Sequence, residues 1–229
     1  MTDSELVEET IVFVKEILRD AEGGHDWFHI QRVFNNTLLI AKKEKVNLLV
    51  VSLGALLHDI ADAKFHDGDE TIGPKMARDF LNSLEVSEET INHVVSIIEH
   101  VSFKSTLGKG SYKGKRFNTL ELQVVQDADR LDALGAIGIA RAFNYGGFKN
   151  RSLYNPDIPP KLKMTKAEYK KSNGPTLNHF YEKLLLLKDK MNTVTGRELA
   201  EERHYYMIDF LKQFYKEWNP LAQKNPPME

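Results

Sequence analysis

Apolar residues recur every three or four positions along almost the whole chain, a period typical of amphipathic helices. We find no segment with the sustained alternation of apolar and polar residues that marks a half-buried strand. Apolar residues make up 41% of the 229 residues, which is enough for a substantial core. The pattern therefore predicts an all-α fold, organised as one large domain or as one domain with a helical extension.

Capping residues and long polar connections delimit the expected helices. The helices are predicted over Ser4–Asp20, Asp26–Lys45, Leu48–Asp59, Thr71–Ser83, Glu88–Val101, Thr119–Leu134, Ile137–Asn144, Thr176–Met191 and Gly196–Trp218. Ser87 and Asn118 are expected N-caps. The chain is accordingly divided into a helical core at 1–145, a basic loop or lid at 146–174, C-terminal helices packing on the core at 175–219, and a frayed tail at 220–229.

Composition excludes several classes of function. The chain has no cysteine, so a metal ion would need histidine and carboxylate ligands, and a cytoplasmic location is expected. A net charge of -2 argues against binding to a nucleic-acid polymer. The acidic N-terminal segment is not typical of a signal peptide, and the longest apolar run, near 48–57, is too short to span a bilayer.

Positive charge is concentrated in the connection that follows the predicted core. Residues 145–175 hold seven lysines and arginines against Asp157 and Glu168, a net charge of +5 in an otherwise negative chain. Gly146 and Gly147 open this segment and are expected to act as a hinge. A basic segment of this length favours an anionic small molecule as the ligand.

The segment LGALLHD places a histidine and a carboxylate at the end of an apolar helix. Asp59 lies four residues after Ala55 and three after Leu56, on the buried side. A buried carboxylate without a partner is very costly, and a metal ion would be one such partner. A single His-Asp pair is nevertheless more often a surface or core pair than a metal site.

A second acidic group lies on the helix predicted over 119–134. Asp129 follows Leu122 by seven residues and Val125 by four, which places it on the apolar stripe. Asp127 and Asp132 fall at other angles. Three carboxylates so close together repel one another unless Arg130 or a metal ion supplies positive charge.

The third segment is HDWFHIQRV, in which His25 and His29 are one helical turn apart. Two imidazoles and two carboxylates form a mixed nitrogen and oxygen ligand set, which suits Mn, Fe, Ni, Co or Zn. The order His29, then His58 and Asp59, then Asp129 resembles the HD-domain metal-dependent phosphohydrolase superfamily. The segments HDWFHIQRV, ALLHDIADAKF, IIEHVSFK and QDADRLDALGAIGIARAF are similar to a bacterial subfamily of small, nucleotide-hydrolysing HD proteins.

This resemblance implies an HD-domain helical bundle with a C-terminal helical extension that hydrolyses phosphate esters or anhydrides. It implies that His29, His58, Asp59 and Asp129 hold one divalent ion, with Mn favoured among Mn, Mg, Fe, Co, Ni and Zn. By the same resemblance, Asp62 handles the attacking water and His25 protonates the leaving oxygen. Asp62 is shorter than the glutamate of some relatives, which weakens the match.

Candidate contacts for the phosphate groups are Lys104, Arg32, Arg130, Lys64 and His100. The expected substrate is a small phosphorylated molecule, with a nucleoside triphosphate that releases pyrophosphate as the first choice. A phosphodiesterase or monophosphatase of the same superfamily, and a nucleotide-binding regulatory module without turnover, remain the alternatives. No membrane partner is expected, and a homo-oligomer is compatible with the sequence.

Overall fold

The computed structural model describes residues 1–21, 26–61, 69, 71–101, 117–165, 168 and 173–221. Within these residues every regular element is a helix, which confirms the predicted all-α class. The chain forms two compact units, one from Met1–Asp129 with Asn192–Gly196 and the other from Arg130–Met191 with Arg197–Glu229. Among the described helices, none has the length and apolar character needed to cross a membrane.

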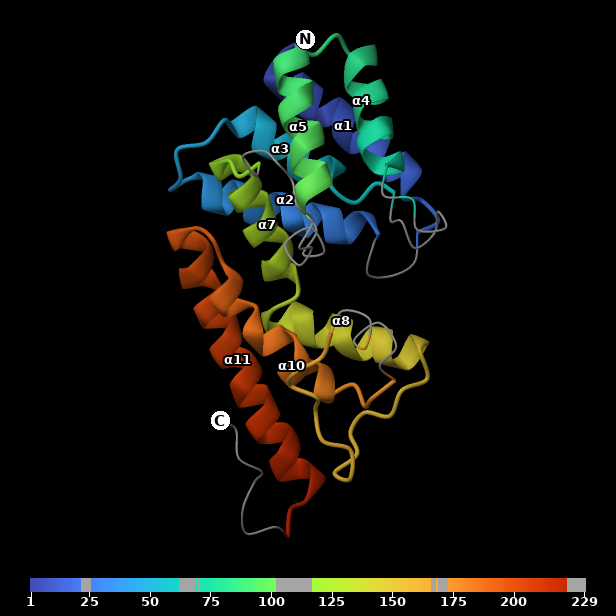
Figure 1. Cartoon of the computed structure of the whole chain (residues 1–229), viewed down its shortest axis with the longest axis vertical. Helices are drawn as coiled ribbons and strands as arrows, with labels where there is room; N and C mark the ends of the chain where they lie inside the picture. The colour runs from blue at the N-terminus through green and yellow to red at the C-terminus, as the bar shows by residue number, and fades with distance from the viewer. Residues whose placement is uncertain are drawn as a thin grey trace. The chain divides into compact units, whose positions relative to one another are not determined.

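The first unit is built around one apolar helix (Figure 1). Its helices are α1 (Asp3–Ile17), α2 (Trp27–Ala41), α3 (Leu48–Leu57), α4 (Ile72–Ser83), α5 (Glu88–Val101) and most of α7 (Leu120–Asp132). Every residue of α3 from Val50 to Leu57 is buried, as expected for a helix that is hydrophobic on all sides. Helices α1, α2 and α5 pack against α3.

Local polar residues set where these helices begin. The side chain of Asn47 accepts a hydrogen bond from the Val50 N–H at the start of α3. The predicted Ser87 cap is confirmed, because the Thr90 N–H donates to its hydroxyl at 3.3 Å. The predicted Asn118 cap is wrong. Thr119, one residue later, accepts from the Leu122 N–H and caps α7, while the Asn118 side chain binds Gln123.

The second unit contains α8 (Gly135–Phe148), α10 (Asn178–Glu182), two short 3₁₀ helices and most of α11 (Val194–Trp218). Phe143, Phe180, Phe210 and Phe214 stack or pack edge-on in its interior, with ring centroids about 6 Å apart. Helix α8 continues through Gly146 and Gly147, which we expected to begin the loop. Gly146 is buried beside Thr176, with no room for a Cβ between them.

The predicted continuous helix over 176–191 is wrong. It is divided into α10, η2 (Leu184–Leu186) and η3 (Lys188–Lys190), with a break at Lys183, whose φ is -146°. Leu184 and Leu187 are both buried, and residues three apart share a face in a 3₁₀ helix. The segment is therefore not a continuous α-helix, although its residues have good helix propensity.

Candidate metal centre

Helix α3 carries His58 from the core to the site. The helix ends at Leu57, and His58 is its C-cap residue. The Nδ1 atom of His58 lies 2.8 Å from the Ala55 carbonyl oxygen, so Nδ1 is the protonated nitrogen that donates this bond. The Nε2 atom then keeps its lone pair, which is the form that a metal ligand requires.

His29 comes from the first turn of α2. Asp26 caps this helix by accepting the His29 backbone N–H at 2.9 Å, which fixes the turn that carries the imidazole. The His29 side chain is only 3% exposed. Its ring lies edge-on to that of His58, with centroids 5.4 Å apart.

Asp129 of α7 completes the cluster. Its Oδ1 lies 3.7 Å from Nε2 of His29 and 3.9 Å from Nε2 of His58. One donor atom each from His29, His58 and Asp59 also lie within 4.8 Å of one another. Donor atoms held about 2.1 Å from one ion lie about 3–4 Å apart, and the distances from Asp129 to the two imidazoles fall in this range. The cluster has the mixed nitrogen and oxygen character expected from the sequence, and the role of each residue as a ligand stays a prediction.

The site is open on the side of Asp129. That carboxylate is 38% exposed, whereas the two imidazoles are almost completely buried. Burial of the imidazoles restricts their orientation, whereas the carboxylate of Asp129 is partly accessible to solvent. Four candidates, His25, Asp62, Lys64 and Lys104, lie outside the described residues.

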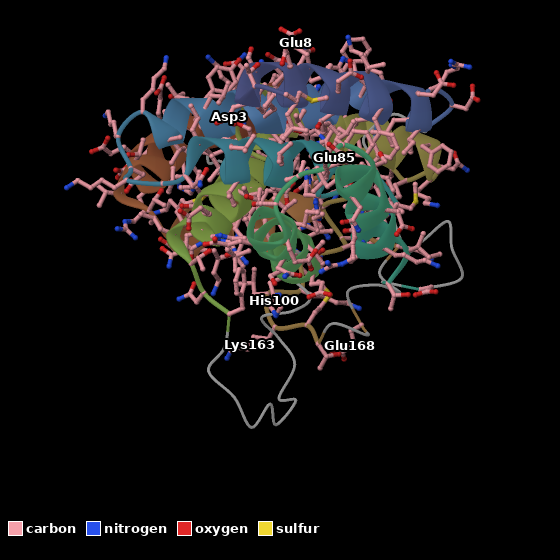
Figure 2. All side chains as sticks on the ribbon, turned by 90° about the horizontal axis from the view of Figure 1, so that it is seen from above. Asp3, Glu8, Glu85, His100, Lys163 and Glu168 are labelled. Carbon is pink, nitrogen blue, oxygen red and sulfur yellow. The ribbon has the colours of Figure 1, made fainter. Side chains whose placement is uncertain are left out.

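The remaining phosphate-binding candidates have structural partners. Arg130 donates to the Lys190 carbonyl oxygen at 2.7 Å, and His100, labelled in Figure 2 in the last turn of α5, bonds through Nδ1 to the Ser96 carbonyl oxygen. Arg32 is half-buried in α2. Their contacts with a phosphate stay predictions.

Two buried carboxylates near Asp129 have roles that the sequence analysis did not assign. Asp127 is fully buried and accepts hydrogen bonds from Asn192 and Thr193, and Asp132 is 1% exposed and pairs with Arg141. The repulsion expected among the three carboxylates is therefore relieved mainly by these donors. Val124 lies three residues before Asp127 and Leu131 four residues after it, on the same face of the helix. This spacing could have predicted that Asp127 is buried.

This helical unit, with its His and Asp cluster, defines an HD-domain protein, and the HD domain family matches residues 27–134. The chain belongs to the HD-domain superfamily, whose members bind divalent metal ions. It is similar to YpgQ of Bacillus subtilis, with 39% identity over 95% of this chain and 96% of YpgQ.

Solved structures support the same assignment. An HD-superfamily hydrolase from Bacillus thuringiensis is 45% identical, with a TM-score of 0.75 over 95% of this chain and 99% of its own. The crystal structure of YpgQ in complex with ADP aligns with a TM-score of 0.73 and 36% identity, over 95% of this chain and 97% of YpgQ. The similarity covers both units, so the second unit is also shared with these relatives.

Proposed function

We propose that the protein is a metal-dependent phosphohydrolase that acts on a nucleotide, with a nucleoside triphosphate and pyrophosphate release as the first choice. The convergence of His29, His58, Asp59 and Asp129 is the observation that carries this proposal. The similarity to an HD-superfamily hydrolase supports hydrolase activity, and the ADP complex of YpgQ supports a nucleotide ligand.

The four side chains would share the work of holding a divalent ion. A bound ion of this kind lowers the pKa of water and polarises a phosphoryl oxygen. The two buried imidazoles would fix the position of the ion because their rings cannot rotate freely. The exposed carboxylate of Asp129 would face the solvent side, where a substrate enters.

Charge supports a polyanionic substrate. The net charge of +5 over 145–175 would attract a triphosphate more strongly than a monophosphate. Lys64, Lys104, Arg32, Arg130 and His100 remain the candidates for direct phosphate contacts, although Arg130 and His100 each also bind a backbone carbonyl oxygen. The proposal also includes a cytoplasmic location and assembly of the protein as a homo-oligomer.

Asp62 would orient the attacking water and His25 would protonate the leaving oxygen. We expect Asp62→Asn to lower kcat at least about tenfold with metal content unchanged. His25→Ala should slow a nucleotide more than an activated aryl phosphate, because a good leaving group needs little protonation. Both roles fail if neither substitution slows nucleotide turnover by that factor.

A turnover panel tests the function. Nucleoside mono-, di- and triphosphates and cyclic nucleotides would be incubated with Mn, Mg, Co or Ni, with pyrophosphate and phosphate measured separately. Pyrophosphate from a triphosphate supports the first choice, phosphate from a monophosphate indicates a monophosphatase, and opening of a cyclic nucleotide indicates a phosphodiesterase. Tight nucleotide binding without turnover under any metal would refute catalysis and favour a regulatory module.

A further inference from the structure

Asp127 lies two residues before the predicted ligand Asp129, on the same helix, and has an unusual environment. Its side chain is fully buried. Four donor groups surround its carboxylate: the backbone N–H and side-chain amide of Asn192, and the backbone N–H and hydroxyl of Thr193. The distances lie between 2.7 and 3.0 Å. A buried carboxylate with this many donors is stably held, whereas one without them would be very costly.

These donors come from the start of another helix. The Thr193 hydroxyl accepts the Gly196 N–H at 2.9 Å and so caps α11. The carboxylate of Asp127 therefore lies at the positive end of that helix. Gly196 makes room for it, because a Cβ there would lie 2.5 Å from Oδ2 of Asp127.

Further polar contacts surround the same turn of α7. Gln126 donates to the His100 carbonyl oxygen at 2.9 Å and accepts from the Asn192 side chain at 3.1 Å. The Asn36 side chain of α2, the helix that carries His29, reaches the Ala128 carbonyl oxygen at 3.4 Å. The turn that presents Asp129 is thus held at three successive residues, from 126 to 128.

We propose that Asp127 is a positioning residue that fixes the rotation and axial position of α7, and thereby places the Asp129 carboxylate beside His29 and His58. Residues two apart on a helix point about 200° apart. Asp127 can therefore be anchored to Asn192 and Thr193 while Asp129 faces the two imidazoles. This inference rests on the proposed metal site.

Without this anchor, part of the free energy of metal binding would be needed to restrict the movement of α7. The Oδ1 atom of Asp129 lies within 3.9 Å of both Nε2 atoms. If the anchor is lost, α7 gains freedom to rotate, and binding must restrict it again. Substitution of residues that support metal ligands typically weakens metal binding about 10–100-fold.

The test measures binding of Mn²⁺ alone, by titration calorimetry, and the visible spectrum of the Co²⁺-loaded protein, which reports ligand geometry. Asp127→Asn keeps the shape but turns an amide N–H₂ toward the existing donors. Asn192→Ala removes one donor and leaves the backbone N–H. The matched control is Val14→Ala in α1, a fully buried position outside the metal cluster that lowers stability by creating a cavity.

We expect Mn²⁺ affinity to fall at least about tenfold in Asp127→Asn and less in Asn192→Ala, with an altered Co²⁺ spectrum in both. Val14→Ala should bind as the wild type does. Wild-type affinity and spectrum in Asp127→Asn would overturn the positioning role. If that variant does not fold, unchanged binding in Asn192→Ala overturns it instead.

Asp129→Ala separates this inference from the metal site on which it rests. Loss of Mn²⁺ binding in Asp129→Ala together with wild-type binding in Asp127→Asn refutes only the positioning role. Retained binding in Asp129→Ala would instead refute the assignment of the metal site itself.

Discussion

Three aspartates within six residues of α7 have three different environments. Asp127 is surrounded by hydrogen-bond donors, Asp132 pairs with Arg141, and Asp129 alone faces the imidazoles of His29 and His58. The helical angle of each residue separates their partners. Identical side chains a few residues apart therefore do different work, and only Asp129 has the partners of a metal ligand.

The predicted metal ligands give the first prediction at this scale. His58→Ala and Asp129→Ala should each abolish bound metal and phosphohydrolase activity, because each removes one of four donors and no cysteine is available to replace it. Metal analysis, turnover and far-ultraviolet circular dichroism would be compared with Glu8→Ala, an exposed position on α1 (Figure 2). Helical content should stay unchanged in all three variants. Full metal content and activity in either ligand variant would refute the site.

At the scale of the element, contacts decide where helices continue and where they stop. Helix α8 runs through two adjacent glycines, and Gly146 is buried beside Thr176, whose N–H donates to the Ser152 carbonyl oxygen at 2.9 Å. The segment after Lys183 forms 3₁₀ turns, with Leu184 and Leu187 both buried. Neither outcome follows from helix propensity.

The two glycines form a matched pair for a stability test. A Cβ at Gly146 would lie 2.1 Å from the Thr176 hydroxyl oxygen, whereas a Cβ at Gly147 would meet nothing within 4 Å. Gly146→Ala should therefore lower the free energy of unfolding by about 1–3 kcal/mol through overpacking. Gly147→Ala should raise it by up to about 1 kcal/mol, since alanine favours the helix. Urea unfolding measures both, and equal effects at the two positions would contradict the contact.

At the scale of the whole molecule, the second unit buries a histidine that the metal chemistry does not use. His179 lies in α10 between buried Asn178 and Phe180. Burial, together with the nearby positive charges of Lys183 and Arg151, lowers the pKa of His179 to about 3. The folded protein therefore keeps this imidazole neutral at pH values well above 3.

An acid-dependent loss of stability follows. In the unfolded chain a histidine has a pKa of about 6.5, so between that value and pH 3 the unfolded state binds a proton that the folded state does not. The free energy of unfolding should therefore decrease as the pH is lowered. For this one group the decrease is about 2 kcal/mol between pH 7 and pH 5. His179→Gln should lose correspondingly less over the same interval in urea unfolding. If His179→Gln lost as much unfolding free energy as the wild type, His179 would not be the source of the acid-dependent loss.

By itself, the sequence predicted the all-α class and most of the helix positions, and its resemblance to HD-domain proteins supplied the four metal ligands, which stay a prediction. The class and the helix positions depend on local periodicity and capping, whereas the predicted ligands come from three separate segments of the chain. The tertiary structure decided the division into two units, the break at Lys183, the continuation of α8 through Gly146 and the environments of Asp127 and Asp132. Each of these depends on contacts between residues far apart in the chain, such as Asp127 with Thr193 and Gly146 with Thr176. Such contacts leave no local period in the sequence, because their geometry exists only after the helices have packed.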